Sequence, residues 1–123
     1  SLQLGTGSLA GALSGTGAVS VASGAQLVFN RSNTVAQGTD FGPVISGAGQ
    51  VVQLGSGTLV FAGSGTNTYS GTTSILNGNL QIGDGGTLGA LSGTSSVIVG
   101  SGAKLVFNRA GILTQSLHFG PVI

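Results

Sequence analysis

Short alternating segments recur along the chain at irregular intervals. Each reads apolar, variable, apolar, which is the pattern of a β-strand with its first and third side chains on one face. The pattern predicts strands over residues 2–4, 27–29, 59–61, 80–82 and 105–107. The first position is Leu every time: Leu2, Leu27, Leu59, Leu80 and Leu105. The third position is large and apolar: Leu4, Phe29, Phe61, Ile82 and Phe107.

A second alternating segment accompanies these strands, at residues 19–21, 52–54, 73–75 and 97–99. In the second of these, Val52 and Leu54 hold the alternate apolar positions. Small residues separate the paired segments, and Gly and Asn among them tolerate the positive φ of a tight corner. These corners are Ser23-Gly24, Ser56-Gly57, Asn77-Gly78 and Ser101-Gly102. No window shows the periodicity of an amphipathic helix.

The chain contains a long internal duplication. Residues 1–45 align without a gap on residues 79–123, with 26 identities in the 45 pairs. The Leu-led segments are spaced by 25, 32, 21 and 25 residues, so the 78-residue period spans three spacings. We therefore expect one β-solenoid segment over residues 1–123, with a full repeat of three turns at 1–78 and a partial one at 79–123. A segment of this kind is expected to be part of a longer array.

Strands of fixed phase joined by loops of variable length predict an all-β fold, a parallel β-solenoid of about five turns. In this interpretation the five Leu residues stack as one inward ladder, and the five residues two positions later form its neighbour. Right-handedness is expected only from the general preference of parallel crossovers, since the sequence pattern itself does not determine it. The competing fold is an antiparallel sandwich or barrel, which also uses short strands with Gly turns.

Composition excludes several classes of protein. The chain has 25 Gly and no Cys, so neither a disulfide scaffold nor a Cys-based zinc site is available. Charged residues make up 4% of the chain and the net charge is +1, too few cations to neutralise nucleic-acid phosphates. Gly, Ser, Thr and Asn interrupt every apolar run, so no membrane-spanning helix is expected in this segment.

One stretch carries a specific motif. It begins Gly-Ser-Gly-Thr-Leu-Val-Phe-Ala-Gly, continues through Asn-Thr-Tyr-Ser-Gly-Thr-Thr, and ends Asn-Gly-Asn-Leu-Gln-Ile-Gly. This stretch, residues 55–83, closely resembles the passenger-associated transport repeat of bacterial autotransporters. The motif positions are Gly55, Gly57, Leu59, Asn67, Tyr69, Gly71, Thr72, Thr73, Gly78, Leu80 and Gly83.

The resemblance implies a right-handed parallel β-helix on the cell surface of a Gram-negative bacterium. It also implies export through a C-terminal β-barrel that this sequence does not contain. The family uses such repeats in stalks and adhesins and as folding segments during secretion. The partners implied are neighbouring repeats of the same chain and, at the surface, host or cell-surface glycans or proteins.

Candidate catalytic chemistry is sparse. Asp40 and the single His118 occupy the same phase of the duplication, so a solenoid would separate them by three turns, beyond hydrogen-bond reach. Asp40 and Asp84 lie at different phases, which argues against paired carboxylates for glycan cleavage. We therefore expect no enzyme activity, no metal site and no cofactor.

Two alternatives to a covalent stalk remain open. The first is a subunit of an extracellular filament, in which separate solenoids stack end to end. The second is a glycan-binding module, in which Phe41 and Phe119 of the recurring Phe-Gly-Pro segments are exposed on one face. Otherwise these aromatic side chains fold back onto the core.

Overall fold

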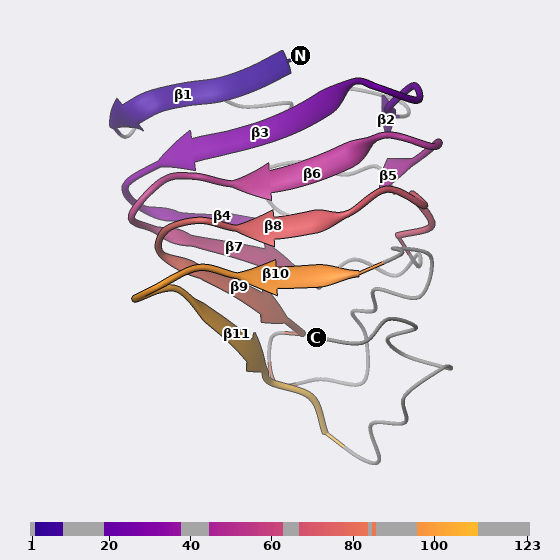
Figure 1. Cartoon of the computed structure of the whole chain (residues 1–123). Coiled ribbons are helices and arrows are strands. Elements are labelled where there is room, and N and C mark those ends of the chain that lie inside the picture. Colours follow the sequence, from indigo (N-terminus) through magenta and orange to yellow (C-terminus); the bar gives the residue numbers. More distant parts are fainter. Residues whose placement is uncertain are drawn as a thin grey trace.

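A computed structural model describes residues 2–8, 19–37, 45–62, 67–83, 85 and 96–110. Within these ranges every regular element is a β-strand and none is a helix (Figure 1). The strands in chain order are β1 (Leu2–Ser8), β2 (Val19–Ser20), β3 (Gln26–Arg31), β4 (Thr34–Ala36), β5 (Ile45–Ser46), β6 (Gln50–Gln53), β7 (Thr58–Phe61), β8 (Thr73–Ile75), β9 (Asn79–Ile82), β10 (Val97–Val99) and β11 (Lys104–Phe107).

The strands form three sheets, and every pair in them is parallel. The first sheet has the order β1-β3-β6-β8-β10, the second β11-β9-β7-β4, and the third pairs β2 with β5. Stacked parallel strands are the arrangement of a β-solenoid and confirm the predicted all-β class. An antiparallel sandwich or barrel would require antiparallel neighbours, so the competing fold is wrong for the described strands.

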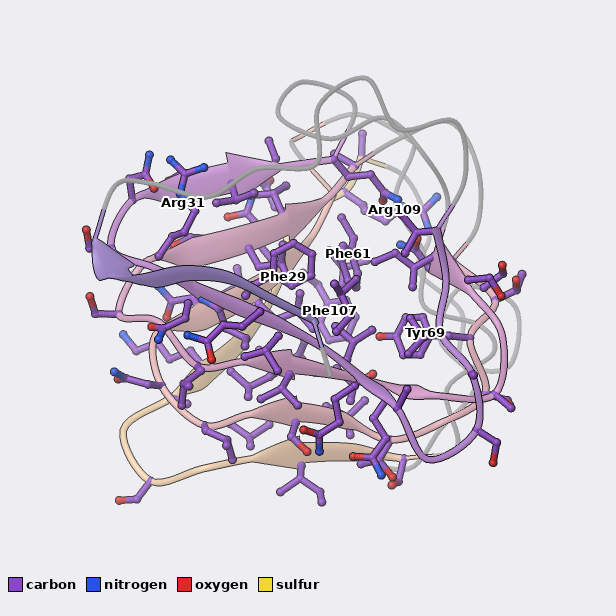
Figure 2. All side chains as sticks on the ribbon, turned by 90° about the horizontal axis from the view of Figure 1, so that it is seen from above. Phe29, Arg31, Phe61, Tyr69, Phe107 and Arg109 are labelled. Carbon is purple, nitrogen blue, oxygen red and sulfur yellow. The ribbon has the colours of Figure 1, made fainter. Side chains whose placement is uncertain are left out.

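The chain alternates between the first and second sheets at tight corners. It passes from β3 to β4, from β6 to β7, from β8 to β9 and from β10 to β11, so each turn adds one strand to both sheets (Figure 1). Seen from above, the labelled side chains of Phe29, Phe61 and Phe107 gather between the sheets (Figure 2).

The interior is a single cluster of stacked apolar side chains. Leu27 and Phe29 of the first sheet are 1% exposed, while Phe61 and Leu80 of the second are fully buried. Complete burial of each such side chain contributes about 1.5–3 kcal/mol of hydrophobic stabilisation. The cluster runs through Val21, Leu27, Phe29, Val35, Ile45, Val51, Leu59, Phe61, Tyr69, Ile75, Leu80, Ile82 and Val97.

The predicted single ladder is wrong, because its members divide between two sheets. Leu2 pairs with Leu27, and Leu4 with Phe29, in the first sheet. In the second sheet Leu59 pairs with Leu80, which pairs with Leu105, and Phe61, Ile82 and Phe107 align in the same way. The rung above Leu59 is Val35, not Leu27.

The ladder divides between two sheets because of the 32-residue spacing between Leu27 and Leu59. From the hydrophobic pattern alone, this spacing looks like one turn of the solenoid. The register pairs Leu27 with Val51 and Val35 with Leu59, so a turn here takes 24 residues. The remaining eight residues carry the chain across one further face. The 78-residue period therefore spans three turns and one face, and Leu27 and its copy Leu105 lie on different sheets.

The side-chain alternation of β6 also departs from the hydrophobic pattern. Val51 and Gln53 are buried in register with the inward positions of β3 and β8, whereas Leu54 is 37% exposed. The apolar pair Val52 and Leu54 therefore alternates with the inward positions and lies outside the core cluster, although Val52 is only 7% exposed. Hydrophobicity alone misleads at this strand because a polar side chain, Gln53, takes an interior place.

Candidate functional site

The repeat motif forms one turn of the solenoid. Gly55 and Gly57 stand at the corner between β6 and β7, and Leu59 lies inside β7. Asn67 and Tyr69 follow on the third side, Thr73 begins β8, Gly78 turns the corner to β9, and Gly83 follows β9. The structure therefore distributes the motif residues around the whole turn and does not gather them at one pocket.

Asn67 is a buried polar link between successive turns. It is 1% exposed, and its Oδ1 accepts hydrogen bonds from Gln37 Nε2 at 2.8 Å and from the Ile45 backbone N–H at 2.9 Å. Its Nδ2 donates to Gln37 Oε1 at 3.1 Å. A buried amide that is satisfied in this way costs little to bury and fixes the register of the chain around it. This explains why the motif places Asn at this position.

Tyr69 fills the interior next to this link. Figure 2 shows its side chain inside the ring of strands, where it is fully buried. Its hydroxyl lies 2.6 Å from Thr73 Oγ1. Burial removes the water that would stabilise the phenolate, so it raises the pKa of the Tyr69 phenol well above its usual range, and the hydrogen bond to Thr73 offsets only part of this. Tyr69 is therefore a neutral packing residue and is not poised for acid–base chemistry near neutral pH.

The motif glycines stand where one turn touches the backbone of a neighbouring turn. A Cβ on Gly57 would overlap the backbone oxygen of Asn33, and one on Gly71 would overlap that of Gly49. The other three motif glycines show the same close approach. A Cβ on Gly55 would overlap the backbone of Arg31, one on Gly78 that of Gly57, and one on Gly83 that of Asn108. Gly78 and Gly83 also have positive φ values of 62° and 90°. Gly is thus required here by close approach as well as by conformation.

The remaining motif residues also contact neighbouring turns. Leu59 and Leu80 stack in the second sheet and are 1% and 0% exposed. Thr72 accepts the Val51 backbone N–H through its carbonyl at 3.2 Å, and its Oγ1 lies 3.5 Å from Ser96 Oγ. Every motif position thus contributes to stacking.

Gln37 and Gln53 are interior residues that the sequence interpretation missed. Gln53 is 3% exposed, and its Nε2 donates to the carbonyl of Gly57 at 3.0 Å and to that of Gly55 at 3.3 Å. Gln37 is 3% exposed and pairs with Asn67. The sequence signal was weak: Gln37 directly follows β4 and Gln53 ends β6, and a polar residue at either place does not by itself indicate burial.

Little acid–base or metal chemistry is available within the ranges that the structure covers. They contain no Asp, Glu or His, and accordingly no cluster of three potential metal-ligating residues of these types or Cys. Asp40, Asp84 and His118 lie outside them, as do Phe41 and Phe119 of the Phe-Gly-Pro segments. The enzymatic and glycan-binding interpretations of those five residues therefore keep the status of sequence predictions.

One hollow opens beside the corner between β2 and β3. Its volume is about 290 Å³, and residues 19–22 and 25–27 line it. The lining is mostly Val, Ala and Leu, with Ser20 and Gln26 as the polar members. It offers no charged group to a ligand.

Among the residues that the structure describes, no helix is long and apolar enough to cross a membrane.

Residues 51–82 match the family model of the Passenger-associated-transport-repeat. No curated protein and no solved structure matched the chain in the corresponding comparisons. The matched residues cover the turn just described, from β6 through β9, and include Asn67, Tyr69 and Gly78. The resemblance predicted from the motif is therefore confirmed over this segment, which matches the transport repeat associated with autotransporter passengers.

Proposed function

We propose that this chain is a non-enzymatic structural segment of an autotransporter passenger, a right-handed β-solenoid that forms part of a rigid stalk of a surface adhesin. The observation that carries the proposal is the structural role of the motif residues. The polar residues of the motif form hydrogen bonds across or within turns. The glycines of the motif allow neighbouring turns to touch, and its apolar residues belong to the core.

Stiffness follows from the way in which consecutive turns are joined. Parallel ladders connect them on the first and second sheets, and β2 and β5 connect them on the third side. The third side continues at Tyr69, whose backbone N–H donates to Ile45 O at 3.2 Å. A turn attached on three sides cannot hinge about one strand, which suits a load-bearing stalk.

The match to the transport repeat also supports a place outside the cytoplasm. Passengers of autotransporters are secreted or displayed at the surface, and the complete absence of Cys is compatible with threading through an oxidising compartment. Neighbouring repeats are the partners that this proposal requires. Adhesion to host or cell-surface glycans or proteins would belong to the assembled stalk.

The second candidate is a subunit of an extracellular filament, and one observation favours it. The last rung of the described solenoid leaves apolar side chains uncovered: Phe107 is 37% and Val99 38% exposed, whereas Phe29 and Phe61 in inner rungs are 1% and 0% exposed. Exposed apolar side chains of this kind can pack against a further rung. The same surface would serve a following turn of one chain or the first turn of another.

The denatured mass of the native polypeptide that carries this sequence separates the two candidates. A covalent array predicts a mass many times the 11.8 kDa of this chain. A mass near 11.8 kDa would instead favour separate subunits that stack end to end. A second experiment tests the passenger assignment: protease is added to intact cells. Cleavage of the same polypeptide would show that it is displayed at the cell surface.

A further inference from the structure

We propose that the corner Asn77-Gly78 is a self-modifying site, at which the Gly78 backbone nitrogen attacks the Asn77 side-chain amide and converts it to a carboxylate. This goes beyond the structural role of the repeat. The sequence contains six Asn, and Asn77 is the one followed by Gly. Gly78 has no side chain that would hinder the attack of its nitrogen on the Asn77 Cγ.

The structure holds the two reacting groups together. The Gly78 backbone N–H donates to Asn77 Oδ1 at 2.9 Å, which places the nitrogen beside the side-chain carbonyl that it attacks. Asn77 is exposed, so water and hydroxide reach the corner. Proximity of this kind replaces an encounter step with an intramolecular one and lowers the activation barrier.

The Gly78 amide is also free to react because it lies outside the sheet ladders. Among the backbone hydrogen bonds of the described residues, its N–H goes to no main-chain carbonyl. The buried Asn67 lacks this freedom, because the following amide, that of Thr68, donates to Ile45 O at 2.9 Å. Asn79 lies within β9, which is paired on both sides.

The reaction balances without any external reagent except water. The deprotonated Gly78 nitrogen forms a bond to Asn77 Cγ, the Cγ–Nδ2 bond breaks, and ammonia leaves after taking up a proton. The resulting five-membered imide is opened by water at either carbonyl. The product is either Asp at position 77 or isoaspartate, the isomer in which the main chain continues through Cβ and Cγ of the former side chain.

The two products differ in what they do to the corner. Both carry a new carboxylate and lower the formal net charge from +1 to 0, but Asp at position 77 keeps the normal main chain and a side-chain oxygen for the Gly78 N–H. The isomer inserts a methylene group into the main chain where Gly78 already touches the backbone of Gly57 and Gly55. It is therefore expected to loosen the contact between two turns, so that the site acts as a slow timer on the stack.

Incubation of the folded full chain in mildly alkaline buffer tests the proposal. Ion exchange would follow the growth of acidic species, and fragment-ion sequencing would assign the modified residue and separate Asn77 from Asn79. We expect Asn77 to react at least about tenfold faster than any other Asn, equivalent to about 1.4 kcal/mol in activation free energy. The rate should rise with pH, because the attack requires deprotonation of the Gly78 amide.

The matched variant is Asn77→Ser, which installs the residue found at the corners of Ser56 and Ser101. It should abolish the acidic species, whereas Asn79→Gln should leave their rate unchanged. Because neither variant is needed for the wild-type measurement, a folding defect in one of them would not decide the result. Retention of the Asn77 amide in the folded chain while the urea-unfolded chain loses it would overturn the proposal, as would equal reaction at Asn79.

Discussion

The side-chain amides of Gln37 and Asn67 form a reciprocal pair in the interior, although 30 residues separate them in the sequence. Each amide donates to the oxygen of the other, at 2.8 Å and 3.1 Å. Asn67 Oδ1 additionally accepts the Ile45 N–H, so one motif side chain connects two other parts of the chain. This relationship gives the Asn of the transport repeat a structural reason.

Replacement of Asn67 by Ala should therefore destabilise the fold strongly. It removes three hydrogen bonds and leaves the buried Ile45 N–H without its acceptor, for a loss of about 2–3 kcal/mol in the free energy of unfolding. Urea denaturation measures this loss. The adjacent, exposed Thr68 provides the control, since Thr68→Ala should change stability by less than about 0.5 kcal/mol. Equal losses for the two variants would contradict the proposed role of Asn67.

The hydrogen bond between Tyr69 and Thr73 predicts a smaller effect. Tyr69→Phe keeps the buried ring and removes the 2.6 Å contact, so it should cost about 1 kcal/mol. A double-mutant cycle with Thr73→Val measures the interaction itself. If the loss of stability in the double variant equals the sum of the losses in the two single variants, the two hydroxyl groups do not interact.

The buried phenol also predicts sensitivity to alkali. Because folding raises the pKa of Tyr69 above its usual value near 10, the unfolded chain loses the proton first. The stabilisation is complete below pH 10 and is lost as the pH rises above it, by about 1.4 kcal/mol per pH unit. Tyr69→Phe, which removes the only Tyr, should flatten this dependence in urea titrations above pH 10. A wild-type slope equal to that of the variant would show that the phenol ionises equally in both states.

The close approach at Gly57 predicts that even one methyl group is harmful. Its Cβ would overlap the backbone oxygen of Asn33, and backbone cannot move aside as a flexible side chain can. We expect Gly57→Ala to lower the melting temperature clearly, by an effect of about 2 kcal/mol or more. The neighbouring Ser56 is exposed, so Ser56→Ala should be nearly neutral. A neutral Gly57→Ala would show that the turns do not touch at this corner.

Stacking position should set the cost of removing an aromatic side chain. Phe61 is fully buried in an inner rung, whereas Phe107 of the last described rung is 37% exposed. Phe61→Ala should cost about 4 kcal/mol and Phe107→Ala roughly half as much, and urea denaturation measures both losses. A further turn stacked on β11 in the native polypeptide would raise the cost at Phe107. Equal costs for the two variants in this chain would contradict the exposed position of Phe107.

The local elements were predictable because short-range chemistry determines them. Leu59-Val60-Phe61 and Leu80-Gln81-Ile82 alternate as strands should, and they pair in the expected register. The Ser-Gly and Asn-Gly corners combine small side chains with tolerance of positive φ. The motif over residues 55–83 was specific enough to identify the matching family.

The assignment of strands to sheets was not predictable in the same way. Both sheets offer similar inward positions, so the sequence Leu-Val-Phe-Asn-Arg fits the first sheet at residues 27–31 and the second at 105–109. Only the pairing of Val35 with Leu59 reveals the extra face within the 32-residue spacing. The buried Gln37 was missed because its partner Asn67 lies 30 residues away, which spacing along the chain does not identify. Gln53 was missed for a different reason: its partners Gly55 and Gly57 are near in sequence, but a polar residue at an inward strand position breaks the hydrophobic pattern.

The most direct test of the central claim is cryo-electron microscopy of the native polypeptide that carries this sequence. A structural stalk predicts an elongated rod of constant width, with parallel strands across its axis and stacked turns about 4.8 Å apart. The density of the motif turn should show Asn67 and Tyr69 facing inward. A compact particle with antiparallel sheets, or a rod in which these two side chains face solvent, would contradict the account.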